Sequence, residues 1–595
     1  MNKIRTFDHW FFYLLFLASL VLSWYFHKDS ARFNNRNELW SDRAGYYIYL
    51  PATFFYHFNA LEMPSDLDIR TGGGFSLDNL KNKIDTKYTY GVALMLSPFF
   101  LSAHLISLIT GFDDENGFSM IYMRMMALAG VVYLILGLWL LHRFLIGYFS
   151  VNISLVVVFL IFSATNLFYY SLIDGMMSHV YSFFLFALFL FSLRNFQMSH
   201  EYRFFLLICL SLALAILIRP TNILPGLCIF FWDAGSRSEV MRRFKQFMQP
   251  RYWLTFAAIL FLIFSPQLIY WKYLSGNFLH FSYRDEGFLN LCNPRIAEAL
   301  FSPLNGLMAF TPFVILMVAG ILIMFVQKKQ NRRLVASMFI LVTMVCASWK
   351  MWYFGCSYGQ RSFIEYYTIL AVPLAWLITK VFNSRFLIVK TILFFPMFFL
   401  VYANLRYTVV LYRFDRCYYG STWDWDYYLR SFERAGVISP VHQIKTYKND
   451  FENLAICPVV KPSQIFTRSG QYSIPGDKKT KKTPLYSARL YEFKFPLPKM
   501  MDVDLWMLSP GRRVGNAALS CNFIRNNIQV FDDSKKLTTA VTAPLVWTKV
   551  SKTFIIPDVN DSSIQINLFI DNPDGSLLYF DDLSIRFRYN WKSAD

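Results

Sequence analysis

The stretch MIYMRMMALAGVVYLILGLWLLH, residues 120–142, decides the fold class. It carries a single Lys, Arg, Asp or Glu side chain, Arg124, among 23 positions, and it contains no proline that would break a helix. A helix rises about 1.5 Å per residue, so about twenty apolar residues cover the roughly 30 Å hydrocarbon core of a bilayer. The stretch is therefore expected to form a helix that spans a membrane.

Comparable apolar runs continue through the first 404 residues and then stop. We expect membrane spans near residues 10–26, 120–142, 152–172, 177–195, 204–219, 222–232, 253–273, 305–326, 334–348, 364–382 and 386–404. The composition of the 595-residue chain agrees, because 55% of its residues are hydrophobic and only 16% are charged. The predicted fold class is therefore a polytopic α-helical membrane protein with about eleven spans.

The formal net charge of +19 comes largely from Lys and Arg residues in short segments between the apolar runs. Such segments are expected on the cytoplasmic side of a membrane, so the charge indicates orientation rather than binding to nucleic acid. The orientation depends on the apolar stretch 88–110. If this stretch spans the bilayer, the basic loops 237–251 and 328–333 both face outward, against the positive-inside rule. We therefore expect a re-entrant segment at 88–110, a cytoplasmic N-terminus and an external C-terminal region.

The sequence changes character after residue 404. Residues 405–480 are rich in Tyr, Trp and charged residues and are expected to form an interfacial connector. Strand-like alternation follows, near residues 485–495, 503–508, 528–531, 546–556 and 564–570. The predicted organisation is a membrane domain at 1–404 with a long external loop at 28–88, then the connector, then an all-β sandwich or jelly roll at 481–595.

Under this topology, polar clusters fall on the external side. The first loop contains Glu38 and Asp42, and a carboxylate there could deprotonate the hydroxyl of an acceptor. The structural alternative, a solvated acid paired with Arg43, is the commoner arrangement. Lys87 and Tyr88 open the stretch 88–110, and Arg124 interrupts the next run. Cations at the headgroup level can bind a phosphate or a diphosphate, or can simply extend to the interface without a ligand.

The remaining polar residues lie in turns between later spans. Asp174 and His179 lie in SLIDGMMSH, where Asp174 could instead cap the next helix. Arg219 lies in the polar break LIRPTN, which could also be only a tight turn between helices. Gln360 and Arg361 end the segment SYGQR beside glycines and aromatic residues, a setting that suits a sugar or a phosphate. Because all these clusters fall on one side, an outward-facing active site is predicted.

No metal or cofactor motif is present in the sequence. The eight cysteines form no CxxC pair and no Cys/His cluster with metal-ligand spacing. Cys209, Cys228 and Cys346 lie in apolar runs and are expected to be buried. No cofactor or metal ligand is predicted, and a divalent metal is left open.

In the order of its elements, the chain resembles the GT-C superfamily of glycosyltransferases that use polyprenyl-phosphate sugars. Over about residues 1–405 it is similar to protein O-mannosyltransferases and to the transferase that adds aminoarabinose to lipid A. The stretches SDRAGYY and YMRMMALAG, together with Lys87, carry this likeness, and LIRPTN, LFSPLNGLMAFTPF and SYGQR resemble bacterial members of the superfamily. The ending LLYFDDLSI resembles carbohydrate-binding jelly rolls.

The resemblance implies an inverting glycosyltransferase embedded in a bacterial inner membrane, with its C-terminal domain in the periplasm. Asp42 occupies the place of the family's general base. Family members often have two adjacent acids there, whereas this chain has Asp42-Arg43 and only Glu38 nearby. Lys87 matches a lysine that contacts the lipid phosphate, and Arg124 matches a functional arginine of the mannosyltransferases. The implied donor is an undecaprenyl- or dolichyl-phosphate sugar, and the acceptor is an external glycan, lipid or protein.

Other functions stay open on the sequence. A flippase or transporter for a lipid-linked glycan would use the same outward-facing cations, but paired broken helices in two matching halves are not evident. A polymerase or ligase that uses diphosphate-linked glycans has closely related chemistry. A glycan receptor would need only one span as an anchor, which argues against that class.

Overall fold

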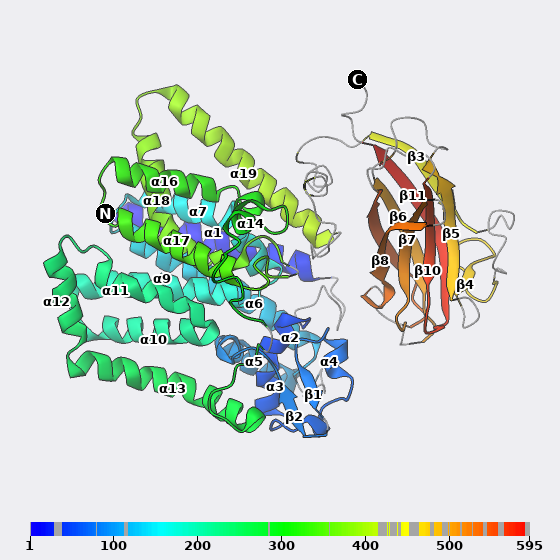
Figure 1. The fold of residues 1–595 in the computed structure, drawn as a ribbon, viewed down its shortest axis with the longest axis horizontal. Coiled ribbons are helices and arrows are strands. Elements are labelled where there is room, and N and C mark those ends of the chain that lie inside the picture. Colours follow the sequence, from blue (N-terminus) through cyan, green and yellow to red (C-terminus); the bar gives the residue numbers. More distant parts are fainter. Residues whose placement is uncertain are drawn as a thin grey trace. The chain divides into compact units, whose positions relative to one another are not determined.

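The computed structural model contains two compact units, Met1–Tyr428 and Leu429–Asp595 (Figure 1). The structure describes residues 2–28, 39–78, 80–111, 117–283, 286–355, 357–413, 425, 428, 437, 442–451, 463–476, 481–490, 498, 500–511, 514–525, 528–539, 544–556 and 564–589. The first unit is helical and the second is built from β-sheets, which agrees with the predicted fold class.

Long apolar helices dominate the first unit. They are α1 (Asn2–His27), α5 (Gly91–Thr110), α6 (Met120–Leu145), α9 (Ser178–Ser199), α13 (Pro250–Ser275) and α19 (Leu387–Arg413). In the part of the chain that the structure describes, these six helices are long and apolar enough to cross a membrane. The unit therefore has the features of a polytopic membrane protein.

Shorter apolar helices complete the bundle. They are α7 (Val151–Ser163), α8 (Leu167–Leu172), α10 (Tyr202–Ile218), α11 (Cys228–Phe231), α16 (Val314–Val326), α17 (Arg332–Ser348) and α18 (Tyr367–Phe382). Helix α10 packs between α9 and α13 (Figure 1). The predicted span 222–232 is a 3-10 turn, η2 (Pro220–Leu227), followed by α11. Cys209, Cys228 and Cys346 are buried in these helices, as predicted.

Two contacts between α1 and α6 define the ends of the bundle. Near one end, the guanidinium of Arg124 donates to the backbone carbonyl of His27, the last residue of α1. Near the other end, Nε2 of His142 lies 3.7 Å from Oδ2 of Asp8. The two helices are therefore antiparallel neighbours, and the chain enters α6 at the end where it left α1. The intervening segment consequently makes no net crossing of the bundle.

Helix α5 corrects the predicted re-entrant segment. Its residues form one continuous helix that does not turn back, although Pro98 lies inside it. The hydroxyl of Tyr133 donates to the carbonyl of Met95 over 2.9 Å, and Nδ1 of His104 lies 3.0 Å from the hydroxyl of Tyr122. Helix α5 thus runs antiparallel to the first half of α6, toward the end where α1 stops. Because of this direction, the chain between α1 and α6 makes no net crossing of the bundle.

The basic loops meet at the opposite end of the bundle. Asn331, which precedes α17, donates to Oδ1 of Asp233 over 2.7 Å, and Tyr148, which follows α6, donates to the same carboxylate. The ammonium of Lys329 lies 3.8 Å from the centroid of the Trp376 ring of α18. Helix α12 (Arg237–Phe247) follows Asp233 at this end. The positive-inside rule predicts that this end faces the cytoplasm.

The first loop is a folded subdomain. It contains α2 (Asp42–Tyr47), α3 (Tyr49–Phe54), η1 (Ala60–Glu62), α4 (Leu67–Arg70) and a hairpin of β1 (Ser76–Asp78) and β2 (Lys83–Asp85). Thr86 donates to the carbonyl of Gly45 over 2.9 Å, and Tyr49 donates to the carbonyl of Tyr88 over 2.6 Å. A Cβ at Gly45 would come within 2.3 Å of the Gly74 carbonyl oxygen, so only glycine permits this approach. These contacts hold α2 beside Tyr88.

Further short elements follow α13 in the helical unit. They are α14 (Ile296–Phe301), α15 (Leu307–Phe310) and η3 (Arg361–Phe363). The hydroxyl of Tyr358 donates to Oδ1 of Asn404 over 2.8 Å, and Asn404 in turn donates to the carbonyl of Ser163 over 2.9 Å. The segment that precedes η3 is thus held by two helices, which fixes the position of Arg361.

The second unit is a two-sheet antiparallel sandwich. One sheet has the order β5–β10–β7–β8, and the other has the order β3–β11–β6–β9, with β4 also paired to β11. The strands are β3 (His442–Asn449), β4 (Ile474–Gly476), β5 (Lys482–Arg489), β6 (Met500–Leu508), β7 (Ala518–Arg525), β8 (Ile528–Lys536), β9 (Thr548–Ile555), β10 (Gln565–Asp571) and β11 (Leu578–Tyr589). Inward-facing residues of both sheets, such as Leu505 and Leu568, form one core.

The domain boundaries differ from the predicted ones. Helix α19 continues to Arg413, and β3 and β4 lie inside the stretch that was predicted to be a connector, 405–480. Strand β3 reads HQIKTYKN, and its polar composition hides its strand character. It pairs with β11 at the edge of its sheet, where one side of a strand needs no apolar neighbour.

Candidate active site

Asp42 forms an ion pair across the helical unit. It is the first residue of α2, and Nη2 of Arg361 donates to its Oδ2 over 3.0 Å. The Asp42 side chain is 31% exposed and that of Arg361 is 15% exposed, so the carboxylate can still be reached. Burial alone would raise the pKa of Asp42. The charges of Arg361 and Lys87 and hydrogen bonds from Tyr88 and Arg361 outweigh burial and hold that pKa below its usual value.

A second acid–arginine group lies around Glu365. Nη1 of Arg219 lies 3.3 Å from Oε1 of Glu365, and Nδ1 of His179 lies 3.2 Å from Oε2. Arg219 also donates to the hydroxyl of Ser362 over 2.9 Å. The Glu365 side chain is 1% exposed.

Tyr46 connects the two groups. Its ring centroid lies 4.2 Å from that of Tyr88, which hydrogen-bonds to Asp42. Burial raises the pKa of Tyr46, and the charges of Arg219, Asp42 and Arg361 all act on its hydroxyl. Both groups therefore share one electrostatic environment. We call the set Asp42, Tyr46, Tyr88, His179, Arg219, Arg361 and Glu365 the acid–arginine cluster.

Lys87 and Gln360 lie beside this cluster. Nζ of Lys87 lies 2.9 Å from Oε1 of Glu286, and its charge acts on Asp42. Gln360 is buried, and its side-chain nitrogen donates to the carbonyl of Trp352 over 2.9 Å. Its Oε1 is a buried acceptor without a hydrogen-bond partner among the described residues. Such an acceptor is available to a ligand hydroxyl, because leaving it unpaired is unfavourable.

The other predicted residues that the structure describes have partners outside the acid–arginine cluster. Asp174 forms an ion pair with Arg43 at 2.7 Å, so Arg43 serves Asp174 rather than Asp42. Arg124 donates to carbonyls of His27 and Lys28 at the end of α1, away from the described contacts of the cluster. Glu38 lies outside the described residues.

Sequence reasoning missed Glu365. It lies at the start of the predicted span 364–382, and an acid inside an apolar run was the signal that could have revealed it. In the described part of the chain, no group of three His, Cys, Asp or Glu side chains is arranged to hold a metal ion. The described cations of the site each face an acid: Arg361 faces Asp42, Arg219 faces Glu365, and Lys87 faces Glu286.

The comparisons with known proteins include a distant structural likeness. No protein-family model matches the sequence, and no curated protein matches it. Among solved structures, the chain is similar to the apo form of the Archaeoglobus fulgidus oligosaccharyltransferase, with 11% sequence identity and a TM-score of 0.36. The match covers 72% of this chain and 56% of that one, so the chain spans about half the length of that structure. A likeness at this level carries no argument about activity.

The fold and the site define a class of protein. The chain has a helical unit with several helices long and apolar enough to cross a membrane, an acid–arginine cluster in that unit and a C-terminal β-sandwich. The cluster gathers residues from the first loop, from the first turn of α9, from the end of α10 and from the segment before α18. A charged cluster of this kind among apolar helices is expected to be functional, because ionisable groups are unfavourable there without a role.

Proposed function

We propose that the chain is a membrane glycosyltransferase that moves a sugar from a polyprenyl-phosphate donor to a hydroxyl of an external acceptor, with inversion. The observation that carries this proposal is the pairing of Asp42 with Arg361 at 3.0 Å, within reach of the charges of Lys87. Sugar transfer from a lipid phosphate needs a base for the acceptor and cations for the phosphate. The cluster supplies both kinds of group side by side.

The cations are proposed to hold the donor phosphate. Arg361 and Arg219 offer planar forks that match phosphate oxygens, and Lys87 adds a point charge. Each of these cations is engaged with an acid in the free protein, so the phosphate would compete with carboxylates for them. When Arg361 turns to the phosphate, Asp42 loses its strongest attractive partner. Its pKa then rises, which makes it a better base in the complex than in the free protein.

The transfer step uses Asp42 as the base and the lipid phosphate as the leaving group. Asp42 takes the proton of the acceptor hydroxyl while the hydroxyl oxygen forms a bond to the anomeric carbon. The bond between that carbon and the phosphate oxygen breaks, and the lipid phosphate leaves with the electron pair. Attack from the face opposite the phosphate inverts the anomeric carbon. A positioned general base typically contributes about 10²–10⁴-fold to such a rate.

Glu365 is a second candidate for the base. It is the other acid of the acid–arginine cluster, and a carboxylate is a suitable general base. Its two oxygens already face Arg219 and His179, whereas Asp42 is more exposed and more accessible to an acceptor. We therefore assign the base to Asp42 and propose that Glu365 holds Arg219 and His179 in position.

The experiment that tests this function uses the purified full-length protein with a panel of polyprenyl-phosphate sugars and polyprenyl-diphosphate-linked glycans, with loss of the donor followed by mass spectrometry. Consumption of at least one donor by the wild type, but not by Asp42→Asn, is expected. The matched control is Asp66→Asn, because Asp66 lies in the same loop but is 43% exposed, and its ion pair among the described residues is with Arg70. A flippase would bind donors without consuming them, and a polymerase or ligase would consume only diphosphate-linked glycans. Either result would contradict the proposal.

A further inference from the structure

Helix α12, at the end of the bundle with the basic loops, presents an exposed apolar stripe. Met241, Phe244 and Met248 recur at intervals of three and four residues, and their side chains are 48%, 48% and 52% exposed. Such spacing puts all three on one face of a helix. The opposite side of the helix faces the protein, where Arg243 is buried and pairs with Glu239 at 2.6 Å. A helix with this pattern is suited to the surface of a bilayer.

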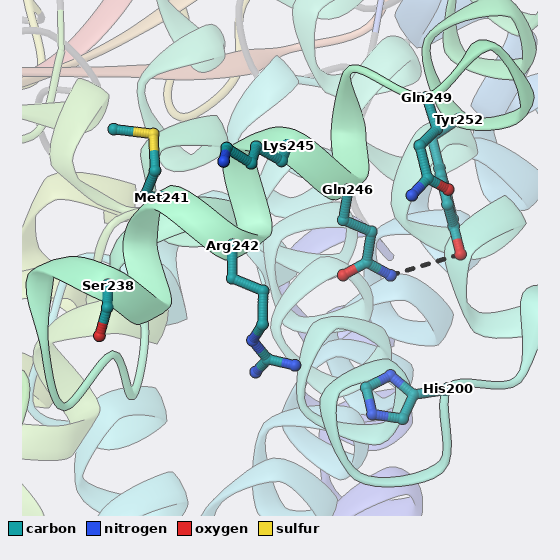
Figure 2. A pocket seen from close by; sticks show the side chains of 8 residues that line it. All are labelled: His200, Ser238, Met241, Arg242, Lys245, Gln246, Gln249 and Tyr252. Atoms are coloured by element: carbon teal, nitrogen blue, oxygen red, sulfur yellow. Dashed lines mark hydrogen bonds between the residues drawn. The ribbon is translucent and has the colours of Figure 1, made fainter.

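A hollow lies beside this stripe, between α12, the turn after α9 and the start of α13. Its volume is about 710 Å³, and its polar lining includes His200, Arg242, Lys245, Gln246, Gln249 and Tyr252. Figure 2 shows Arg242 and Gln246 extending from α12 on the side of His200, and Gln246 donates to the Tyr252 hydroxyl over 3.3 Å. The described residues that line the hollow include no carboxylate.

The cations of the hollow are poorly neutralised. The nearest acid to Arg242 is Glu239 at 3.8 Å, and Arg243 holds the same Glu239 oxygen at 2.6 Å. Lys245 has no ion-pair partner among the described residues. Residues 233–251 contain five basic and two acidic residues, so the local field is positive. An anion that enters the hollow therefore gains attraction without displacing a strong internal ion pair, in contrast to the acid–arginine cluster.

We propose that this hollow binds the phosphate headgroup of an anionic phospholipid. Arg242, Lys245 and His200 face the phosphate, and Gln246, Gln249 and Tyr252 offer hydrogen bonds to the rest of the headgroup. The acyl chains lie against Met241, Phe244 and Met248, so a lipid explains both the cations and the adjacent apolar stripe. The site is separate from the acid–arginine cluster and does not depend on the proposed activity.

The test uses the full-length protein in detergent, titrated with short-chain phosphatidylglycerol while its melting temperature is recorded. Short-chain phosphatidylcholine and inorganic phosphate are the comparison probes. Phosphatidylglycerol is expected to raise the melting temperature in a saturable way, whereas the other two probes are not. An equal response to phosphatidylcholine or to inorganic phosphate would overturn the proposal, because it would indicate a site for acyl chains alone or for a free anion.

Variants locate the site on α12. Each cation near a membrane phosphate contributes about fivefold to binding, so the double variant Arg242→Gln/Lys245→Gln is expected to weaken phosphatidylglycerol binding about 25-fold. Arg237→Gln is the matched control, because Arg237 is an exposed arginine of the same helix that does not line the hollow. A loss in the control equal to that of Arg242→Gln or Lys245→Gln alone, about fivefold each, would mean that only the general positive field acts, and the site would then be rejected. Native mass spectrometry of retained lipid provides a readout that does not depend on stability.

Discussion

The two ends of the helical unit carry charge in opposite ways. At one end, Asp42, Arg361, Arg219 and Glu365 form pairs between segments that are far apart in the sequence, and these side chains are largely withdrawn from solvent. At the other end, Arg242 and Lys245 are exposed and lack strong partners among the described residues. The effect of a buried, paired charge depends on its exact position, because a single partner balances it. Exposed excess charges act mainly through their sum, except where a hollow gathers them.

The largest expected difference between the two ends is which side of the membrane each faces. A cysteine at Ser238, in the basic segment, should be inaccessible to a reagent that cannot cross the membrane and acts from the external side. A cysteine at Ser576 of the β-sandwich should react fully. The positive-inside rule is the physical reason. Labelling at Ser238 but not at Ser576 would invert the orientation.

The next largest effect is expected at Asp42. Asp42→Asn keeps the size of the side chain but cannot take up the acceptor proton, so turnover should fall about 10²–10⁴-fold while donor binding is retained. Turnover and donor affinity are measured on the same preparation, and circular dichroism checks the fold. Near-normal turnover in Asp42→Asn together with an inactive Glu365→Gln would move the base to Glu365. If both variants are active, Glu38 and Asp174 are the acids to replace next.

Replacement of the cations should weaken donor binding. A charge-assisted contact to phosphate contributes about 1.5–3 kcal/mol, so Arg361→Ala and Lys87→Ala should each weaken donor affinity about 10- to 150-fold. Arg361→Lys should recover only part of the loss, because lysine lacks the planar fork. Arg124→Ala sharpens the comparison, since Arg124 contacts carbonyls at the end of α1 and is expected to lower the melting temperature instead. A loss of donor affinity in Arg124→Ala would support the role implied by the family resemblance.

Much of the fold could be predicted because membrane spans require long apolar runs and sheet cores require alternating apolar residues. The predicted spans other than 222–232 each fall on one or more α-helices, since a bilayer requires long apolar runs whatever their neighbours. The strands near 503–508 and 564–570 were predicted from alternation. Strand β3 was not predicted because an edge strand tolerates polar residues. The continuous helix α5 was not predicted because an apolar run does not show whether the chain turns back within it.

By itself, the sequence determined the membrane class, the β-sandwich and the candidate residues Asp42, Lys87, Arg219 and Arg361, because each is visible in local composition. Only the tertiary structure decided their partners. In the structure, Asp42 pairs with Arg361 and Arg43 pairs with Asp174. Glu365 lies beside Arg219. Asp42 and Arg361 are 319 residues apart, and an ion pair at that separation leaves no local pattern. Its formation depends on the packing that holds α2 beside Tyr88 and fixes the segment before η3.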